Sequence, residues 1–329
     1  MARTSIDGCC AEGESMSRVP VALVFPGQGT QKQGMGEPWR DTASWSLTEE
    51  VSAATGEDLA DLLLYTPAEQ LRRTDLAQLA VFTVALMAHA EAVRAGSLGG
   101  PVVACAGHSL GEYAALVAAG ALDVGRAAEL VAVRGRAMRE AALASKGTMG
   151  VVVAAPLDQV DELVAGIRAE GAEVWVANIN APGQTVVSGS PEGVAETGER
   201  AGSIGGKMLR LDVGGAFHSP YMAPAAEALG RALQETAFAA DHLPVVANVD
   251  AAPHTGGHVW PDLGVRQLTS PVRWEESVRT LTGPLGCRRL VELGAGRTLS
   301  GLIRRIAPEA ETVSVNGPSA LATPTAVRR

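Results

Sequence analysis

Residues 102–119 read VVACAGHSLGEYAALVAA, and this stretch predicts the class of fold. Its apolar start, Val102–Ala106, predicts a buried strand, and Glu112–Ala119 predicts a helix that ends at Gly120. The two are joined by Gly107–Gly111, a short turn of the form Gly-x-Ser-x-Gly. In sheets with parallel strands, loops at the carboxyl ends of strands build functional sites. The sequence therefore predicts an α/β fold with a site at this turn.

The surrounding segments extend the same pattern. Val21–Phe25 predicts a second buried strand, which runs into the loop Pro26-Gly27-Gln28-Gly29. Further strands are expected near Val245–Val249 and Arg289–Glu292. Helices are expected at Asp58–Leu64, Asp75–Val93, Gly125–Leu143, Ala223–Thr236, Trp274–Leu281 and Leu299–Ile306. Together they form a large α/β domain around a parallel sheet.

Residues 144–211 differ in their order of elements. Strand, helix, strand, strand, helix and strand are predicted in turn, at Gly147–Ala155, Leu157–Glu170, Glu173–Asn178, Gln184–Ser188, Pro191–Ala201 and Lys207–Asp212. This order is ferredoxin-like. We therefore expect a small subdomain at 144–211, inserted into a large domain made of 19–143 and 212–316. Residues 1–18 are expected to be a disordered extension and 317–329 a loose tail.

Composition limits the class of protein. The 329 residues are 47% hydrophobic and 19% charged, enough for a sizeable core, and the net charge of -9 argues against nucleic acid or an anionic membrane as main partner. The cysteines, Cys9, Cys10, Cys105 and Cys287, have neither metal-ligand nor disulfide spacing. No secretory signal or long uninterrupted apolar run is present. We expect a cytoplasmic monomer without metal or cofactor.

Ser109 is the candidate nucleophile. The glycines of the turn leave no side chain in the way, so the turn can be tight enough to lift the serine hydroxyl clear of the sheet. The following helix begins directly after it, and a helix N-terminus stabilises nearby negative charge. The backbone N–H of Leu110 is placed to donate to an oxyanion. A structural turn without chemistry is the alternative.

A serine hydroxyl needs a base, and His218 is the candidate. It lies in Gly214–Pro220, a glycine-rich loop between a predicted strand and a helix. His89 is expected to be structural in its helix, and His242, His254 and His258 are expected to be solvated. Asp212 is too close to His218 in sequence to orient it. A backbone carbonyl or side-chain amide is therefore expected in place of the usual acid.

Arg134 is a charge on an apolar helix face, which is made of Ala127, Leu130, Val131, Ala137 and Met138. Burying a guanidinium without a partner costs several kcal/mol. A carboxylate would give a charge-assisted, bidentate pair. From spacing alone, that carboxylate is either an internal Asp or Glu or part of a substrate.

The two glycine-rich loops give weak signals. Pro26–Gln31 lacks the Gly-Lys-Ser/Thr ending of a phosphate loop and the spacing of a dinucleotide fingerprint, but its N–H groups could serve an oxyanion. Gly294-Ala295-Gly296 predicts a turn.

Taken in order, several segments resemble the malonyl-CoA:acyl carrier protein transacylase family, which includes free-standing acyltransferases of polyketide pathways. The matching segments are 25–31 (FPGQGTQ), 107–113 (GHSLGEY), 134–138 (RGRAM), 178–184 (NINAPGQ), 216–219 (AFHS), 267–274 (QLTSPVRW) and 292–296 (ELGAG). The resemblance runs from about residue 20 to about residue 315. It implies a hydrolase-like core with a ferredoxin-like insertion, and transfer of a malonyl group from malonyl-CoA to the phosphopantetheine thiol of a carrier protein.

The resemblance also implies roles by position. Ser109 would be the nucleophile and His218 its base, oriented by the backbone carbonyl of Gln267. Gln28 and Leu110 would supply the oxyanion N–H groups, and Arg134 would bind the free carboxylate of the substrate. His108 and Phe217 would line the substrate site, and the pair Ala216-Phe217 is similar to that of malonyl-selective members. An acidic carrier needs a basic patch, for which Lys207, Arg210, Arg297 and Arg304 are candidates; a solvated face is the alternative.

Three other functions remain open at this point. The same chemistry could move methylmalonyl or another acyl group, or hydrolyse acyl-carrier thioesters as an editing enzyme. A plain serine esterase would have an ordinary acid in its triad and no use for a buried arginine. A nucleotide-binding protein is disfavoured because the phosphate-loop residues are missing.

Overall fold

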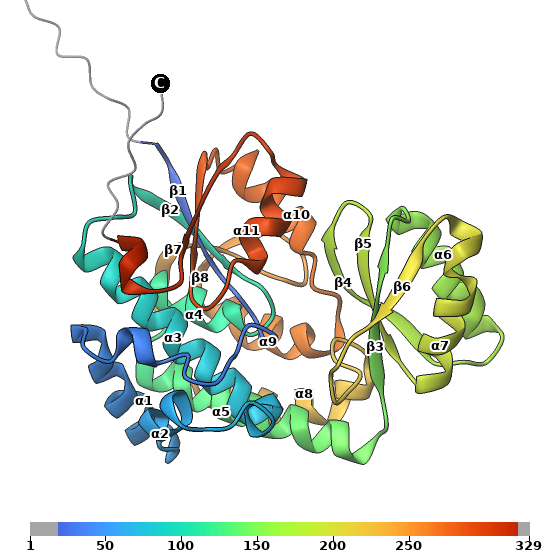
Figure 1. Cartoon of the computed structure of the whole chain (residues 1–329), viewed down its shortest axis with the longest axis horizontal. Coiled ribbons are helices and arrows are strands. Elements are labelled where there is room, and N and C mark those ends of the chain that lie inside the picture. The colour runs from blue at the N-terminus through green and yellow to red at the C-terminus, as the bar shows by residue number, and fades with distance from the viewer. Residues whose placement is uncertain (1–18, 322–329) are drawn as a thin grey trace, which may run out of the picture.

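The computed structural model describes residues 19–321, which form two sheets flanked by helices (Figure 1). The predicted N-terminal extension, its two cysteines and residues 322–329 lie outside the described residues. The six-stranded sheet has the order β10-β9-β1-β2-β7-β8. Its strands are β1 (Val21–Phe25), β2 (Val102–Gly107), β7 (Asp241–Val246), β8 (Pro253–Gly256), β9 (Arg289–Leu293) and β10 (Glu311–Val315). All neighbours are parallel except β7 and β8, so the predicted α/β class with a parallel sheet is confirmed.

Helices cover both faces of this sheet because its strands are apolar on both sides. In β1, Val21, Leu23 and Phe25 join one core cluster, whereas Ala22 and Val24 join another. The first cluster packs under α1 (Leu47–Thr55), α2 (Leu59–Leu64), α3 (Thr74–Arg94), α4 (Gly111–Ala118), α5 (Val124–Ala144), α8 (Ala223–Glu235) and α9 (Trp260–Thr269). The second packs under α10 (Trp274–Thr282) and α11 (Thr298–Ile306).

Short 3-10 helices complete the connections. They are η1 (Glu37–Trp39), η2 (Ala43–Ser46), η3 (Gln70–Arg72), η4 (Ala201–Ile204), η5 (Pro220–Met222), η6 (Gly257–Val259) and η7 (Pro318–Leu321). Since η7 contacts α3, ordered structure extends into the segment predicted to be a loose tail.

Helix α3 has the length and composition of a membrane span, with 21 residues and a mean hydropathy of 1.6. Its most apolar window is 72% buried inside the protein, and α3 packs against α5 and α4. The apolar composition of α3 therefore matches its place in the core of the large domain.

The second sheet lies beside the first, on the right in Figure 1. Its elements are β3 (Thr148–Val153), α6 (Leu157–Ala169), β4 (Val174–Ala181), β5 (Gln184–Gly189), α7 (Pro191–Arg200) and β6 (Lys207–Arg210). The sheet is antiparallel with the order β4-β5-β3-β6, which is the expected ferredoxin-like pattern. Helices α6 and α7 cover one face, while Met149, Val151 and Val186 on the other face join the main core. The exact domain boundaries stay a prediction.

Four regular elements were not predicted: α1, α9, β8 and β10. Helix α9 has buried residues at helical spacing, namely Trp260, Leu263, Gly264, Gln267 and Leu268. A glycine and a glutamine at two of these positions hide the apolar stripe from a sequence pattern. Strands β8 and β10 are short and lie at the two sheet edges, where half-exposed residues give little alternation.

Candidate active site

The turn between β2 and α4 holds Ser109 in a left-handed backbone conformation, with φ 52°. Such a conformation is strained for a residue with a side chain and is typical of nucleophile turns. A Cβ atom on Gly107 would lie 1.9 Å from the carbonyl carbon of Gly111, and one on Gly111 would lie 2.1 Å from the Phe25 oxygen. The chain therefore passes here only with glycine at both positions.

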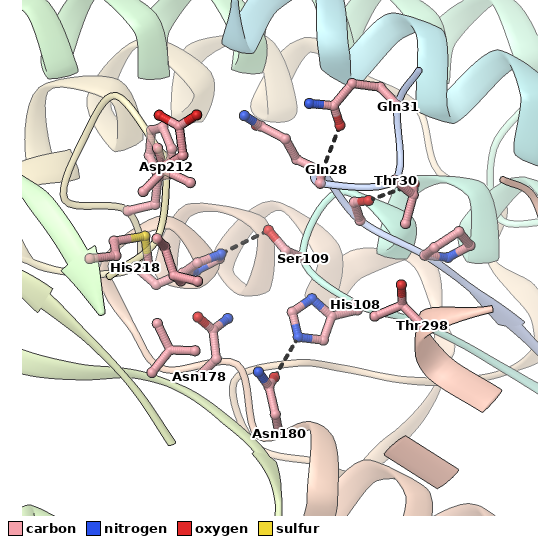
Figure 2. A pocket seen from close by; sticks show the side chains of 18 of the residues that line it. Gln28, Thr30, Gln31, His108, Ser109, Asn178, Asn180, Asp212, His218 and Thr298 are labelled. Carbon is pink, nitrogen blue, oxygen red and sulfur yellow. Dashed lines mark hydrogen bonds between the residues drawn. The ribbon is translucent and has the colours of Figure 1, made fainter. Parts of the chain in front are cut away.

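His218 lies opposite this turn, on the connection that leads from β6 to η5. Its Nε2 is 2.7 Å from Ser109 Oγ (Figure 2), and its Nδ1 is 2.9 Å from the backbone oxygen of Gln267. A carbonyl oxygen can only accept, so Nδ1 carries the proton and Nε2 is free to accept the serine O–H. The geometry thus presents the tautomer that a general base needs.

The backbone carbonyl of Gln267 occupies the position that an Asp or Glu side chain has beside the histidine of a usual catalytic triad. None of the ion pairs and hydrogen bonds among residues 19–321 joins His218 to a carboxylate, and Asp212 instead pairs with Arg72 at the exposed mouth of the pocket. His218 is only 4% exposed. Burial and the charge of Arg134 lower the pKa of His218 from 6.5 to about 3, so the imidazole is neutral at physiological pH.

Arg134, on α5, is 1% exposed and lies beside the two residues. Its NH2 donates to Ser109 Oγ at 3.0 Å and to Gln267 Oε1 at 2.9 Å, and its NH1 donates to Gln78 Oε1 at 2.8 Å. The hydroxyl of Ser109 therefore accepts from a cation while it donates to His218. Such a contact favours the developing alkoxide.

The partners of Arg134 are all neutral. No ion pair within residues 19–321 includes Arg134, and its Nε–H is buried without an acceptor there. A guanidinium has five N–H donors, so the three bonds to oxygen leave it able to take a further acceptor. The internal carboxylate that spacing alone left open is thus not in direct contact, and the guanidinium faces the cavity.

The cavity in front of Ser109 has a volume of about 660 Å³ and lies between the two sheets. One wall comes from the loop after β1 and from the start of α11. The opposite wall comes from the inserted sheet, through Met149, Asn178, Asn180, Gln184 and Val186. Figure 2 shows Asn178 and Asn180 pointing toward the side of the cavity where Ser109 and His108 lie. The volume is within the range of pockets that bind small molecules.

Gln28 follows β1 and Leu110 follows Ser109 at the end of β2, and Gln28 lines the cavity (Figure 2). Among the residues described, the backbone N–H of neither residue donates a hydrogen bond. The loop of Gln28 is braced by its own side chains, because Gly29 N–H donates to Gln31 Oε1 at 2.7 Å and Thr30 Oγ1 donates to the Gly27 oxygen. Both N–H groups are therefore available to an oxyanion.

His108 and Phe217 both line the cavity. The Nε2 of His108 lies 2.9 Å from Asn180 Oδ1, so His108 joins the nucleophile turn to the inserted sheet. Phe217 is 6% exposed and immediately precedes the base.

The candidate carrier-protein residues are all exposed, but they do not form one patch. Lys207 and Arg210 lie on β6, an edge strand of the small sheet. Arg304 lies on α11 and Arg297 is the residue before its first turn, and α11 contacts β4 at the other edge. The structure therefore divides them into two pairs, of which the second lies on or directly before the helix that lines the cavity.

Other histidines lie away from the cavity. His89 is half-buried and packs edge-on against Phe25. His242 and His254 are not simply solvated, because they pack around Trp260, whose Nε1 donates to His242 Nε2 at 2.9 Å. Among residues 19–321, no group of three or more His, Cys, Asp and Glu is placed to hold a metal ion.

Sequence reasoning gave no role to three buried polar residues near the site, Gln78, Glu112 and Asn248. Gln78 is a polar residue in an apolar stretch of α3 and could have been found by the argument used for Arg134. Glu112 is 3% exposed in the first turn after the nucleophile, and Asn248 follows β7 as the first polar residue after a buried run. Asn248 also holds the turn, since its Oδ1 accepts from Ser109 N at 2.7 Å.

Comparison with known proteins gives the same family. The model of the acyl transferase domain matches residues 22–295. The malonyl CoA-acyl carrier protein transacylase of Escherichia coli (strain K12) is 39% identical over 307 residues, which is 92% of this chain and 97% of the relative.

Solved structures agree with this match. The malonyl CoA-acyl carrier protein transacylase of Coxiella burnetii has a TM-score of 0.88 at 32% identity, covering 93% of this chain and 97% of that one. A malonyl-transacylase in complex with its type II PKS acyl-carrier protein has a TM-score of 0.86 at 34% identity, covering 92% and 97%.

Proposed function

The chain belongs to the acyl transferase family, among the malonyl CoA-acyl carrier protein transacylases, and we propose that it performs their reaction through an acyl-Ser109 intermediate. It is an acyltransferase that moves a malonyl group from malonyl-CoA to an acyl carrier protein. The relatives of this kind include a polyketide biosynthesis malonyl CoA-acyl carrier protein transacylase of Bacillus velezensis. The roles of individual residues are part of the proposal.

The observation that carries the proposal is the environment of Arg134. A buried guanidinium without a carboxylate partner lies within hydrogen-bond distance of a serine that has a histidine as its base. A neutral acyl group would leave this charge unbalanced, whereas the free carboxylate of a malonyl group would pair with it. This favours a dicarboxylic cargo over the substrates of a plain esterase.

In the first half-reaction, Ser109 Oγ attacks the thioester carbonyl while His218 Nε2 takes the hydroxyl proton. The backbone N–H groups of Gln28 and Leu110 stabilise the oxyanion. When the intermediate collapses, the carbon–sulfur bond breaks and His218 returns the proton to the sulfur of coenzyme A. A malonyl ester of Ser109 remains, with its carboxylate on Arg134.

In the second half-reaction, the phosphopantetheine thiol of the carrier attacks this ester. His218 takes the thiol proton and returns it to Ser109 Oγ as the new thioester forms. The Phe217 side chain narrows the cavity beside the base, which favours malonyl over methylmalonyl, the alternative cargo. No cofactor or metal enters these steps.

The neutral state of His218 gives a prediction for its titration. Because burial and Arg134 lower its pKa to about 3, we expect the imidazole of the free enzyme to remain neutral at pH 5, well below the ordinary value of 6.5. The malonate dianion, bound at Arg134, should screen the cation and raise this pKa, and Arg134→Met should do the same. NMR titration of the His218 ring measures this pKa in the free enzyme, in the malonate complex and in Arg134→Met. A pKa near 6.5 in the free enzyme would contradict this account of the site.

The function itself is tested by supplying malonyl-CoA together with a holo acyl carrier protein. We expect malonyl-carrier protein and free coenzyme A in equal amounts, with much less free malonate, as followed by mass spectrometry. Free malonate as the main product would instead indicate the editing hydrolase. Absence of both products would contradict the proposed function.

Charge-reversal variants test which surface binds the carrier protein. We propose that the carrier contacts α11, because Arg304 lies on this helix and Arg297 directly before it, and the helix lines the cavity. The double variant Arg297→Glu/Arg304→Glu should slow transfer to the carrier by roughly tenfold, yet leave loading of the enzyme from malonyl-CoA unchanged. Lys207→Glu/Arg210→Glu tests the other edge, and Arg231→Glu on α8 is the matched control.

We further propose that the protein acts as a cytoplasmic monomer without nucleic acid or membrane as partner. The net charge of -9 supports this, because it disfavours polyanionic surfaces. The burial of the most apolar helix, α3, in the core also supports it.

A further inference from the structure

Glu112 is a buried carboxylate that the proposed mechanism does not use. It lies in the first turn of α4, three residues after Ser109, and is 3% exposed. Burial raises its pKa to about 7, while its hydrogen bonds to Asn248 and Gln267 and the charge of Arg134 act in the opposite direction. Burying a carboxylate of this kind lowers the stability of the fold unless hydrogen-bond donors satisfy its oxygens.

The two oxygens of Glu112 contact two different segments. Oε1 accepts from Gln267 Nε2 on α9 at 2.7 Å. Oε2 accepts from both the backbone N and the Nδ2 of Asn248, after β7, at 2.7 Å each. All three neighbours donate, which suits an ionised carboxylate and leaves no place for a donor.

The first segment leads to the base and to the carboxylate-binding residue. With its Nε2 held by Glu112, the Gln267 amide points its Oε1 at Arg134 NH2, 2.9 Å away. The opposite orientation would set amide N–H groups against a guanidinium that can only donate. The backbone oxygen of Gln267 accepts from His218. Gln267 therefore contacts both Arg134 and His218.

The second segment leads to the nucleophile. With its Nδ2 held by Glu112, Asn248 points its Oδ1 at the backbone N–H of Ser109. Its Nδ2 also donates to the Gly107 oxygen at 2.6 Å, so Asn248 bridges the turn. Reversing this amide would place two oxygens together at Gly107 and two donors together at Ser109.

We propose that Glu112 is a positioning residue, whose carboxylate fixes the orientations of Gln267 and Asn248 and thereby aligns Arg134, His218 and the Ser109 turn. This rests on the proposed roles of Ser109, His218 and Arg134. Glu112 touches neither substrate nor reacting atoms and acts through two neutral amides. It also supplies a buried negative charge, one amide away from Arg134, that partly balances the guanidinium.

The test uses Glu112→Gln, which keeps the shape but turns one acceptor into a donor. The new N–H group must face Gln267 or Asn248, so one of the two amides loses its orientation. Since small misplacements of reacting groups cost about 10²-fold, the rate of Ser109 labelling by a neutral alkyl fluorophosphonate at pH 8 should fall by roughly that factor. Glu140→Gln, an exposed change on α5, is the matched control.

A rescue separates positioning from mere stability. In Gln267→Glu, two carboxylates face each other, and labelling should be slow. Adding Glu112→Gln to that variant restores a donor opposite an acceptor, so the double variant should react faster than Gln267→Glu alone. The same substitution is thus harmful in one background and beneficial in the other, even if Glu112→Gln alone fails to fold.

The outcomes are distinct from those that test the function. The wild type is first loaded from malonyl-CoA; if it does not load, the proposed function fails. If it loads, and Glu112→Gln labels at the wild-type rate, the inference is overturned. A double variant no faster than Gln267→Glu also overturns it, because a restored donor–acceptor pair between residues 112 and 267 would then have no effect on Ser109.

Discussion

Ser109→Ala is expected to abolish the malonyl adduct that the wild-type enzyme acquires from malonyl-CoA. The substitution removes the only atom that forms a bond to the acyl group, while His218 and Arg134 keep their places. In serine hydrolases, removing the nucleophile costs on the order of 10⁶-fold in turnover, so transfer to the carrier should fall to background. Intact-mass measurement of the protein after brief exposure to malonyl-CoA reports the adduct directly.

Ser145→Ala is the control for this experiment, because Ser145 is exposed at the end of α5 and far in sequence from the turn. It should load like the wild type. If Ser109→Ala and the wild type gave the same mass shift, the acyl group would reside elsewhere and the proposed intermediate would be wrong.

The second large effect is expected for Arg134→Ala, which should reverse the choice of cargo. Truncating one partner of a buried, hydrogen-bonded charge pair costs about 2–5 kcal/mol, so malonyl loading should fall by roughly 30- to 4,000-fold. Acetyl loading should be retained or should rise, because removal of an unbalanced charge beside the acyl methyl group offsets the lost contact between Arg134 and Ser109 Oγ. Competition between malonyl-CoA and acetyl-CoA with mass readout gives the ratio in one experiment.

Arg134→Lys is the informative companion variant. It keeps the charge but loses the planar fork that contacts Gln78, Gln267 and Ser109 together. We expect it to load malonyl more slowly than the wild type yet to prefer malonyl over acetyl. An unchanged preference in Arg134→Ala would exclude a carboxylate-binding role for this residue.

The fold could be predicted wherever burial produces a recognisable pattern of apolar residues in the sequence. The strands β1 and β2 are apolar along their whole length because helices cover both faces of the sheet, and α6 of the inserted unit has Val160, Val164 and Ile167 buried at helical spacing. Helix α9 was missed because Gln267, on its buried side, serves the site instead of the core. Local sequence patterns predict structure least well where a residue makes its main contacts with distant parts of the chain rather than within its own helix or strand.

The same limit applies to the site. Ser109 could be inferred from its own turn, and Arg134 from a charge on an apolar stripe. His218 could not be distinguished from other loop histidines by residue patterns alone, since its partner carbonyl on α9 is 49 residues away. The resemblance to a family supplied that pairing. Asn248 falls inside the strand expected at Val245–Val249 and gives no signal of its role, because its importance depends on a hydrogen bond to a residue 139 positions earlier.

The two walls of the cavity have different origins, and this bears on how such an enzyme can diversify. Ser109, His218, Arg134 and Gln267 all lie outside the inserted sheet, which contributes only Met149, Asn178, Asn180, Gln184 and Val186. Mutations in the insertion can therefore reshape the space around the cargo while leaving the reacting groups on their own scaffold. Descendants of one ancestral enzyme could change the shape of the space around the cargo through this module, while the need for a cargo carboxylate stays tied to Arg134 on the large domain.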